Sequence, residues 1–86
     1  MTRFWEAKMC RFTDESRKLL SRRLKRARKG SGVRSLERSC AEYGLDSATA
    51  FRAIHGIGNP TAATIVALSD LFAVDAGKLL EGLEVE

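Results

Sequence analysis

The chain has 86 residues and a formal net charge of +4, which is enough for one folded domain. Apolar residues make up 44% and charged residues 30%, a balance typical of a globular protein and not of a disordered one. No apolar run approaches the roughly 18–20 residues that a membrane-spanning helix needs, and charges interrupt the first twelve residues, so we expect no membrane segment and no signal peptide. We therefore expect a cytoplasmic protein, in which Cys10 and Cys40 stay reduced.

Positive charge is concentrated in the first 34 residues. They hold twelve lysines and arginines against three acids, a net charge of +9, whereas residues 35–86 hold three against eight, a net charge of −5. A basic half of this kind favours a polyanionic partner. Charge alone is equally compatible with a solvated helix face.

The first predicted helix begins at Thr13 or Asp14, either of which can cap it, and ends at Gly30 and Gly32. Leu20, Leu24 and Ala27 recur at i, i+4 and i+7, which predicts one buried stripe. Basic residues occupy much of the remaining surface of this helix.

Four further helices follow, separated by glycines and turns. Ser35 caps the second, which ends at Gly44; Asp46 or Ser47 caps the third, and residues 56–60 then form a loop. The fourth helix has Thr61 as its cap and buries Ile65, Leu68 and Phe72, and the fifth has Asp75 as its cap. The pattern predicts an all-α fold, a compact orthogonal bundle of about five helices over residues 14–83. An aromatic and basic extension (residues 1–13) precedes it, and an acidic tail (residues 84–86) follows.

The segment from Ser35 to His55 reads as a helix, a glycine-containing turn and a second helix. The small Cys40 allows the two helices to cross closely, Gly44 forms the turn, and Leu45 fills the joint. Such a helix-turn-helix places the N-terminal side chains of its second helix in the major groove of DNA. We therefore predict a DNA-reading module here.

The run from Leu20 to Leu80 resembles the lambda-repressor/Cro-like (XRE-type) helix-turn-helix superfamily. The matching features are Lys29-Gly30, Ser35-Leu36-Glu37, Gly44-Leu45, the Gly56…Asn59-Pro60 loop and the segment from Leu68 to Asp75. Residues 51–61 look most similar to small antitoxin-type and prophage regulators. The chain departs from the superfamily pattern at Ser39, Cys40, Ala50 and Ile54.

The resemblance implies a base-reading face at the start of the second helix of the motif. Its members are Ser47, Ala48, Thr49, Phe51 and Arg52. Arg52 is the sharpest candidate, because a guanidinium can hold O6 and N7 of guanine with two hydrogen bonds. Phe51 has two open roles: its ring contacts a thymine methyl group, or it turns inward to supply the volume that Ala50 lacks. The inward role is the one we favour.

The resemblance also implies residues that hold the DNA backbone. They are Lys29, Arg34, Ser35, His55, Asn59 and Thr61. Ser35 and the amides that follow it suit a phosphate, since a helix N-terminus attracts anions. The lone histidine, His55, has no cysteine or carboxylate cluster at ligand spacing, so we expect no metal and no cofactor.

A homodimer is expected, because two recognition helices then read a palindromic operator. The contact is predicted in the last helix, in the 56–60 loop or in the N-terminal aromatic segment. The candidate interface residues are Trp5, Leu79, Leu80 and Leu83.

An enzyme is not expected, since the sequence holds no nucleophile–base pair and no glycine-rich phosphate loop after a strand. An RNA-binding role is disfavoured by the lack of an aromatic platform. The sequence thus predicts a nucleoid-associated regulator of transcription, a repressor that binds double-stranded DNA as a homodimer. The alternative is an antitoxin-type module that neutralises a partner toxin, with or without regulating its own gene through DNA.

Overall fold

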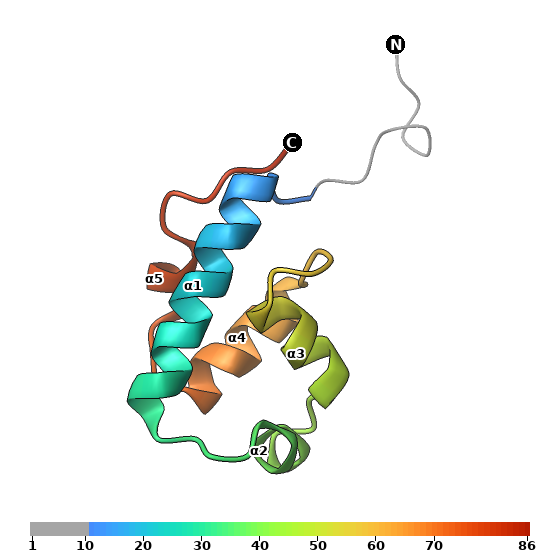
Figure 1. The fold of residues 1–86 in the computed structure, drawn as a ribbon, viewed down its shortest axis with the longest axis vertical. Helices are drawn as coiled ribbons and strands as arrows, with labels where there is room; N and C mark the ends of the chain where they lie inside the picture. The colour runs from blue at the N-terminus through green and yellow to red at the C-terminus, as the bar shows by residue number, and fades with distance from the viewer. Residues whose placement is uncertain (1–10) are drawn as a thin grey trace.

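Five helices make up the described part of the chain, residues 11–86, in a computed structural model (Figure 1). They are α1 (Asp14–Ser31), α2 (Leu36–Glu42), α3 (Ser47–Ile54), α4 (Ala62–Leu71) and α5 (Ala76–Leu80). Short connections join them, so the helices cross one another and do not run in parallel. The predicted all-α bundle of about five helices is confirmed.

Side-chain caps fix where four of these helices begin. Thr13, Ser35, Thr61 and Asp75 each accept a hydrogen bond from a backbone amide two or three residues later, at 3.0–3.3 Å. Each bond satisfies an amide that has no partner inside the helix, a gain of about 1 kcal/mol. Ser35, Thr61 and Asp75 were predicted as caps from the sequence, and Thr13 was one of the two candidates for the cap of α1. At the other end of α1, Gly32 adopts a left-handed conformation (φ 77°), which ends the helix.

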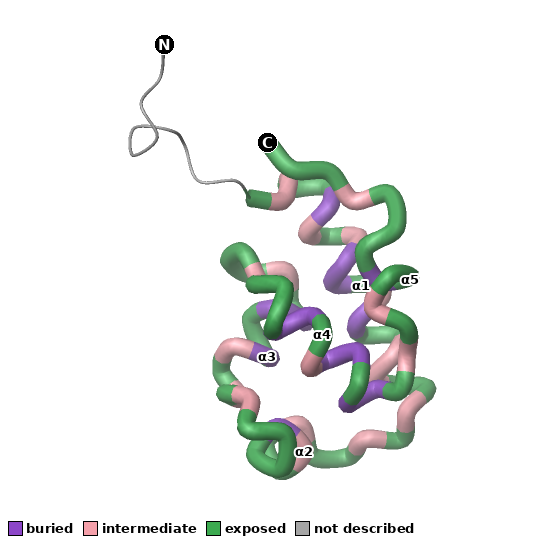
Figure 2. The backbone as a smooth tube through the Cα atoms, turned by 180° about the vertical axis from the view of Figure 1, so that it is seen from behind, coloured by how far each residue is buried: buried purple, intermediate pink, exposed green. Residues whose placement is uncertain are grey.

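The core lies between α1, α3 and α4, whose buried stretches face one another (Figure 2). It is closed by Cys40 from α2 and Leu79 from α5. The other members are Leu20, Leu24, Ala50, Ala53, Ile54, Ile65, Leu68, Leu71 and Phe72. The stripe predicted on α1 is confirmed at Leu20 and Leu24, and Ala27 is half-buried beside it.

α3 sits at the centre of the fold, in contact with α1, α2 and α4. Its last turn is tied to α1 by the buried hydroxyl of Ser21, which donates a hydrogen bond to the carbonyl of Ile54 at 2.5 Å. Gly56 follows with φ +71°, and a Cβ atom there would lie 3.4 Å from the Cβ of Ser21. These contacts fix the position of α3 on α1.

The last residues of the chain run antiparallel to the first described ones. Phe12 and Val85 form an isolated β-bridge, and backbone hydrogen bonds of 2.9–3.1 Å join residues 11–13 to residues 84–86. Phe12 is half-buried against the core. Residues 11–13 were expected to belong to an extension and residues 84–86 to form a tail, but the structure attaches both segments to the helical body.

The sequence predicted no membrane-spanning segment, and the helices of the structure can be compared with that expectation. Over residues 11–86, every helix is too short or too polar to cross a bilayer.

Candidate nucleic-acid interface

The second and third helices form a helix-turn-helix. Residues 43–46 connect them, and Gly44 adopts the left-handed conformation (φ 67°) that the turn requires. Figure 1 shows α2 nearly end-on while α3 lies across the view, so the two helices cross steeply. Cys40 is fully buried at this crossing, and burial raises the pKa of its thiol. The predicted roles of Cys40, Gly44 and Leu45, which packs half-buried against the core, are confirmed.

The outer face of α3 borders a hollow of about 510 Å³ that we call the reading hollow. Ala48, Phe51 and Arg52 are exposed there, and Ser47 is half-buried. The residues that line the reading hollow are Leu36, Glu37, Ser47, Ala48, Phe51 and Arg52. The structure thus brings four of the five predicted base-reading residues together with the first turn of α2.

Thr49, the fifth predicted base-reading residue, is engaged elsewhere. Its hydroxyl donates a hydrogen bond to a carboxylate oxygen of Asp46 at 2.9 Å. This bond, together with the nearby amides of Ala48 and Thr49 and the charge of Arg52, holds the pKa of Asp46 below its ordinary value. Asp46 is therefore an anion at neutral pH, and the pair stiffens the first turn of α3.

The favoured inward role of Phe51 is wrong. Its side chain is 51% exposed, and its ring packs against the ring of His55 with a centroid distance of 4.1 Å and a 39° tilt. Ala50 is fully buried and fills its site in the core without help. The reason is the helical register: Ala50, Ala53 and Ile54 share the inner face, and Phe51 is rotated about 100° away from Ala50.

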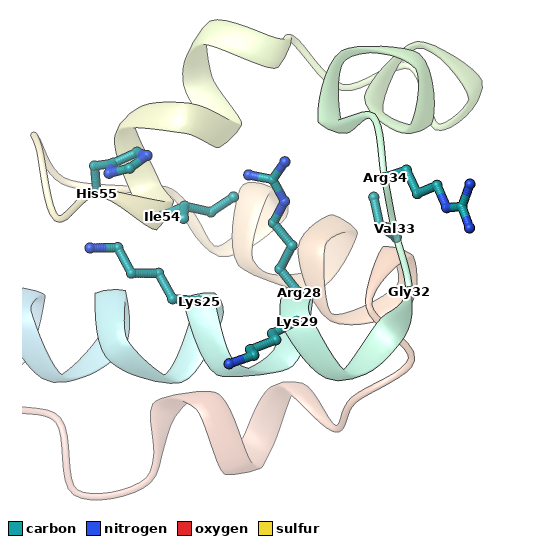
Figure 3. Close-up of a pocket in the computed structure, with 8 residues that line it drawn as sticks. All are labelled: Lys25, Arg28, Lys29, Gly32, Val33, Arg34, Ile54 and His55. Carbon is teal, nitrogen blue, oxygen red and sulfur yellow. The ribbon is translucent and has the colours of Figure 1, made fainter.

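A second hollow of about 510 Å³, which we call the basic groove, lies between α1 and the end of α3 (Figure 3). Its lining carries four lysine or arginine side chains and His55, and it contains no acidic side chain. The lining residues are Lys25, Arg28, Lys29, Gly32, Val33, Arg34, Ile54 and His55. A concave wall of one charge attracts a polyanion such as a phosphate backbone.

The side chains of the basic groove differ in direction. Figure 3 shows Lys25 and Arg28 rising from α1 towards α3, with His55 facing Lys25, while Arg34 points away from them. The predicted phosphate residues Lys29, Arg34 and His55 all line this groove, but the side chains of Lys29 and Arg34 point away from the space between Lys25 and His55. Sequence reasoning missed Lys25 and Arg28, although their i, i+3, i+4 spacing with Lys29 signalled a shared face of α1.

The other predicted phosphate residues do not line the basic groove. Ser35 is exposed at the start of α2, where its hydroxyl serves as the helix cap. The side-chain oxygen of Asn59 accepts a hydrogen bond from the amide of Phe12 at 3.0 Å, and Thr61 caps α4. Asn59 therefore ties the 56–60 loop to the segment before α1, and Thr61 fixes the start of α4.

Arg23 shows that the positive charge of α1 is not all directed at one surface. Its guanidinium donates hydrogen bonds to the carbonyls of Lys78, Leu79 and Glu81 at 2.6–3.3 Å. Arg23 thereby satisfies carbonyls at the end of α5, the role a basic side chain plays at a helix C-terminus. It is a structural residue.

The predicted interface residues occupy different environments. Leu79 is 4% exposed and belongs to the core, so its prediction as an interface residue needs correction: its side chain is already packed within the protomer. Leu80 is 37% exposed, and Leu83 is half-buried against the core. Trp5 lies outside the described residues.

Comparisons with protein-family models, with curated proteins and with solved structures return no match. In the described part of the chain, no three histidine, cysteine or carboxylate side chains are grouped as a metal site would require.

Proposed function

We propose that this protein binds double-stranded DNA in a sequence-specific manner and represses transcription as a homodimer on a palindromic operator. The observation that carries the proposal is that the reading hollow and the basic groove both border α3. Its outer face is exposed in a helix-turn-helix, and its C-terminal end (Ile54 and the cap residue His55) forms one wall of the basic groove. A recognition helix in the major groove needs a cationic wall beside it, where the DNA backbone passes.

The two surfaces have different tasks in this proposal. The basic groove binds phosphates and sets the position of α3, without reading sequence. Arg52 is exposed in the reading hollow and supplies the sequence-dependent contact, two hydrogen bonds to one guanine.

The experiment compares Arg52→Ala with the unaltered protein on two duplexes, an operator selected from randomised DNA and a random duplex. We expect Arg52→Ala to weaken operator binding by about 1–3 kcal/mol, roughly 5- to 150-fold, and to change random binding little. Lys25→Ala is the matched control, because it removes a charge from the basic groove and weakens both complexes alike. Equal losses on both duplexes for Arg52→Ala would contradict base reading.

A partner protein, such as a toxin, is the second candidate. The observation that favours it is the exposure of large apolar side chains: Phe51, Ile57 and Val66 are each 50–53% exposed. A protein partner bound through such side chains gives a complex that tolerates salt, whereas a DNA complex weakens steeply as salt rises. Co-purification of a salt-resistant complex together with no selection of any duplex would support this candidate.

A further inference from the structure

The reading hollow has an apolar wall, formed by Leu36, Ala48 and Phe51. Phe51 exposes half of its surface, and its packing against His55 holds the ring at that surface. The free energy of an exposed phenyl ring falls when it covers another apolar group. This wall therefore favours a partner that presents an apolar group in reach of α3.

The polar groups of the reading hollow are few. They are the Ser47 hydroxyl, the Glu37 carboxylate and the Arg52 guanidinium. The hollow has no asparagine or glutamine, the side chains that recognise adenine with two hydrogen bonds. Asp46 and Thr49, the next polar groups along α3, are bonded to each other. Arg52 is the one side chain lining the hollow that can hold a base with two hydrogen bonds, and Glu37 and Ser47 can each add a single contact.

We propose that the apolar wall of the reading hollow receives the C5-methyl group of a pyrimidine next to the guanine that Arg52 contacts. The methyl group at C5 is the apolar group that a base pair presents in the major groove. Phe51 and Arg52 are neighbours in α3 and line the same hollow, so one base step can meet both. The inference depends on the proposed function and adds to it the chemical class of base that is read. Thymine and 5-methylcytosine both carry this group.

The first test changes only the DNA. Each thymine of the selected operator is replaced by deoxyuridine, which removes the methyl group and keeps every hydrogen-bonding atom. We expect one position in each half-site to weaken binding about fourfold, the effect of leaving one methyl-sized group unburied. Unchanged binding at every position would overturn the inference.

A second pair of duplexes distinguishes the two sources of the methyl group. At the sensitive position, the thymine–adenine pair is replaced by a 5-methylcytosine–guanine pair or by a cytosine–guanine pair. Retained binding with 5-methylcytosine and loss with cytosine support the inference and show that either source is accepted. Loss with both, alongside the deoxyuridine effect, supports it and assigns the group to thymine.

The protein side of the test uses Phe51→Ala. We expect the variant to bind the thymine and deoxyuridine operators equally well, because the wall that senses the methyl group is gone. Val66→Ala is the matched control, a half-exposed apolar side chain on α4 that keeps the fourfold difference. A Phe51→Ala variant that still distinguishes the two operators would overturn the inference. Failure to select any operator would instead contradict the proposed function, so the two failures are separate.

Discussion

A single buried hydroxyl, that of Ser21, sets the end of α3 against α1. We expect Ser21→Ala to lower the free energy of unfolding by about 1–3 kcal/mol, because the Ile54 carbonyl loses its buried donor. Urea denaturation followed by circular dichroism measures this loss.

Ser69→Ala is the control for this prediction. Ser69 is as buried as Ser21, but its hydroxyl donates to the carbonyl of Val66 within the same helix, α4. A carbonyl inside a helix keeps its backbone partner, so the expected loss is smaller. Equal losses in the two variants would show that the Ser21 hydrogen bond between α1 and α3 stabilises the fold no more than a hydrogen bond within one helix.

At the residue scale, the sequence predicted well what depends on near neighbours in the chain. Ser35, Thr61 and Asp75 were predicted as caps, and Thr13 as one of two candidates, because a cap is decided within about three residues. The orientation of Phe51 was not predicted correctly, because it depends on whether the space beside Ala50 is already filled. Only the packed structure shows that it is.

At the scale of elements, the structure joins α1 and α3 in the basic groove. We expect the double variant Lys25→Gln with Lys29→Gln to bind every duplex more weakly. The slope of log affinity against log salt should fall by about 0.9 for each phosphate contact removed. Titrations at several salt concentrations measure the slope.

The double variant Arg22→Gln with Arg26→Gln is the matched control for the groove. It removes the same charge from α1, but neither side chain lines the basic groove, and Arg26 instead lines a hollow between α1 and the segment before α5. A nearly unchanged slope is expected. The same slope change in both double variants would mean that only net charge matters.

The helices themselves were predictable from glycines, caps and apolar spacing, which are local signals. The groove was only partly predictable. The spacing of Lys25, Arg28 and Lys29 shows that they share a face of α1, but it does not show that His55 faces Lys25. That neighbour depends on tertiary packing between residues far apart in the sequence.

At the scale of the whole molecule, the proposed function requires two copies of the chain. Sedimentation at micromolar concentration should show a dimer, and two recognition helices should bind half-sites about 34 Å apart. Insertion of half a helical turn of DNA between the half-sites should abolish tight binding, because it moves one half-site to the opposite face of the duplex.

Insertion of a full turn is the control for that experiment, since it restores the common face and changes only the distance. A protein that remains a monomer with and without operator would contradict the palindrome model. The expected contact surface excludes the side chain of Leu79, which is buried within the protomer, and includes that of Leu80.

The pairing of residues 11–13 with residues 84–86 has a mechanical consequence. Both segments lie at the end of α1 that is farthest from α2 (Figure 1). A pulling force applied to these two segments would enter and leave the molecule at one corner. The force would first break the backbone hydrogen bonds between the two segments one after another. It would not pass through the helix-turn-helix.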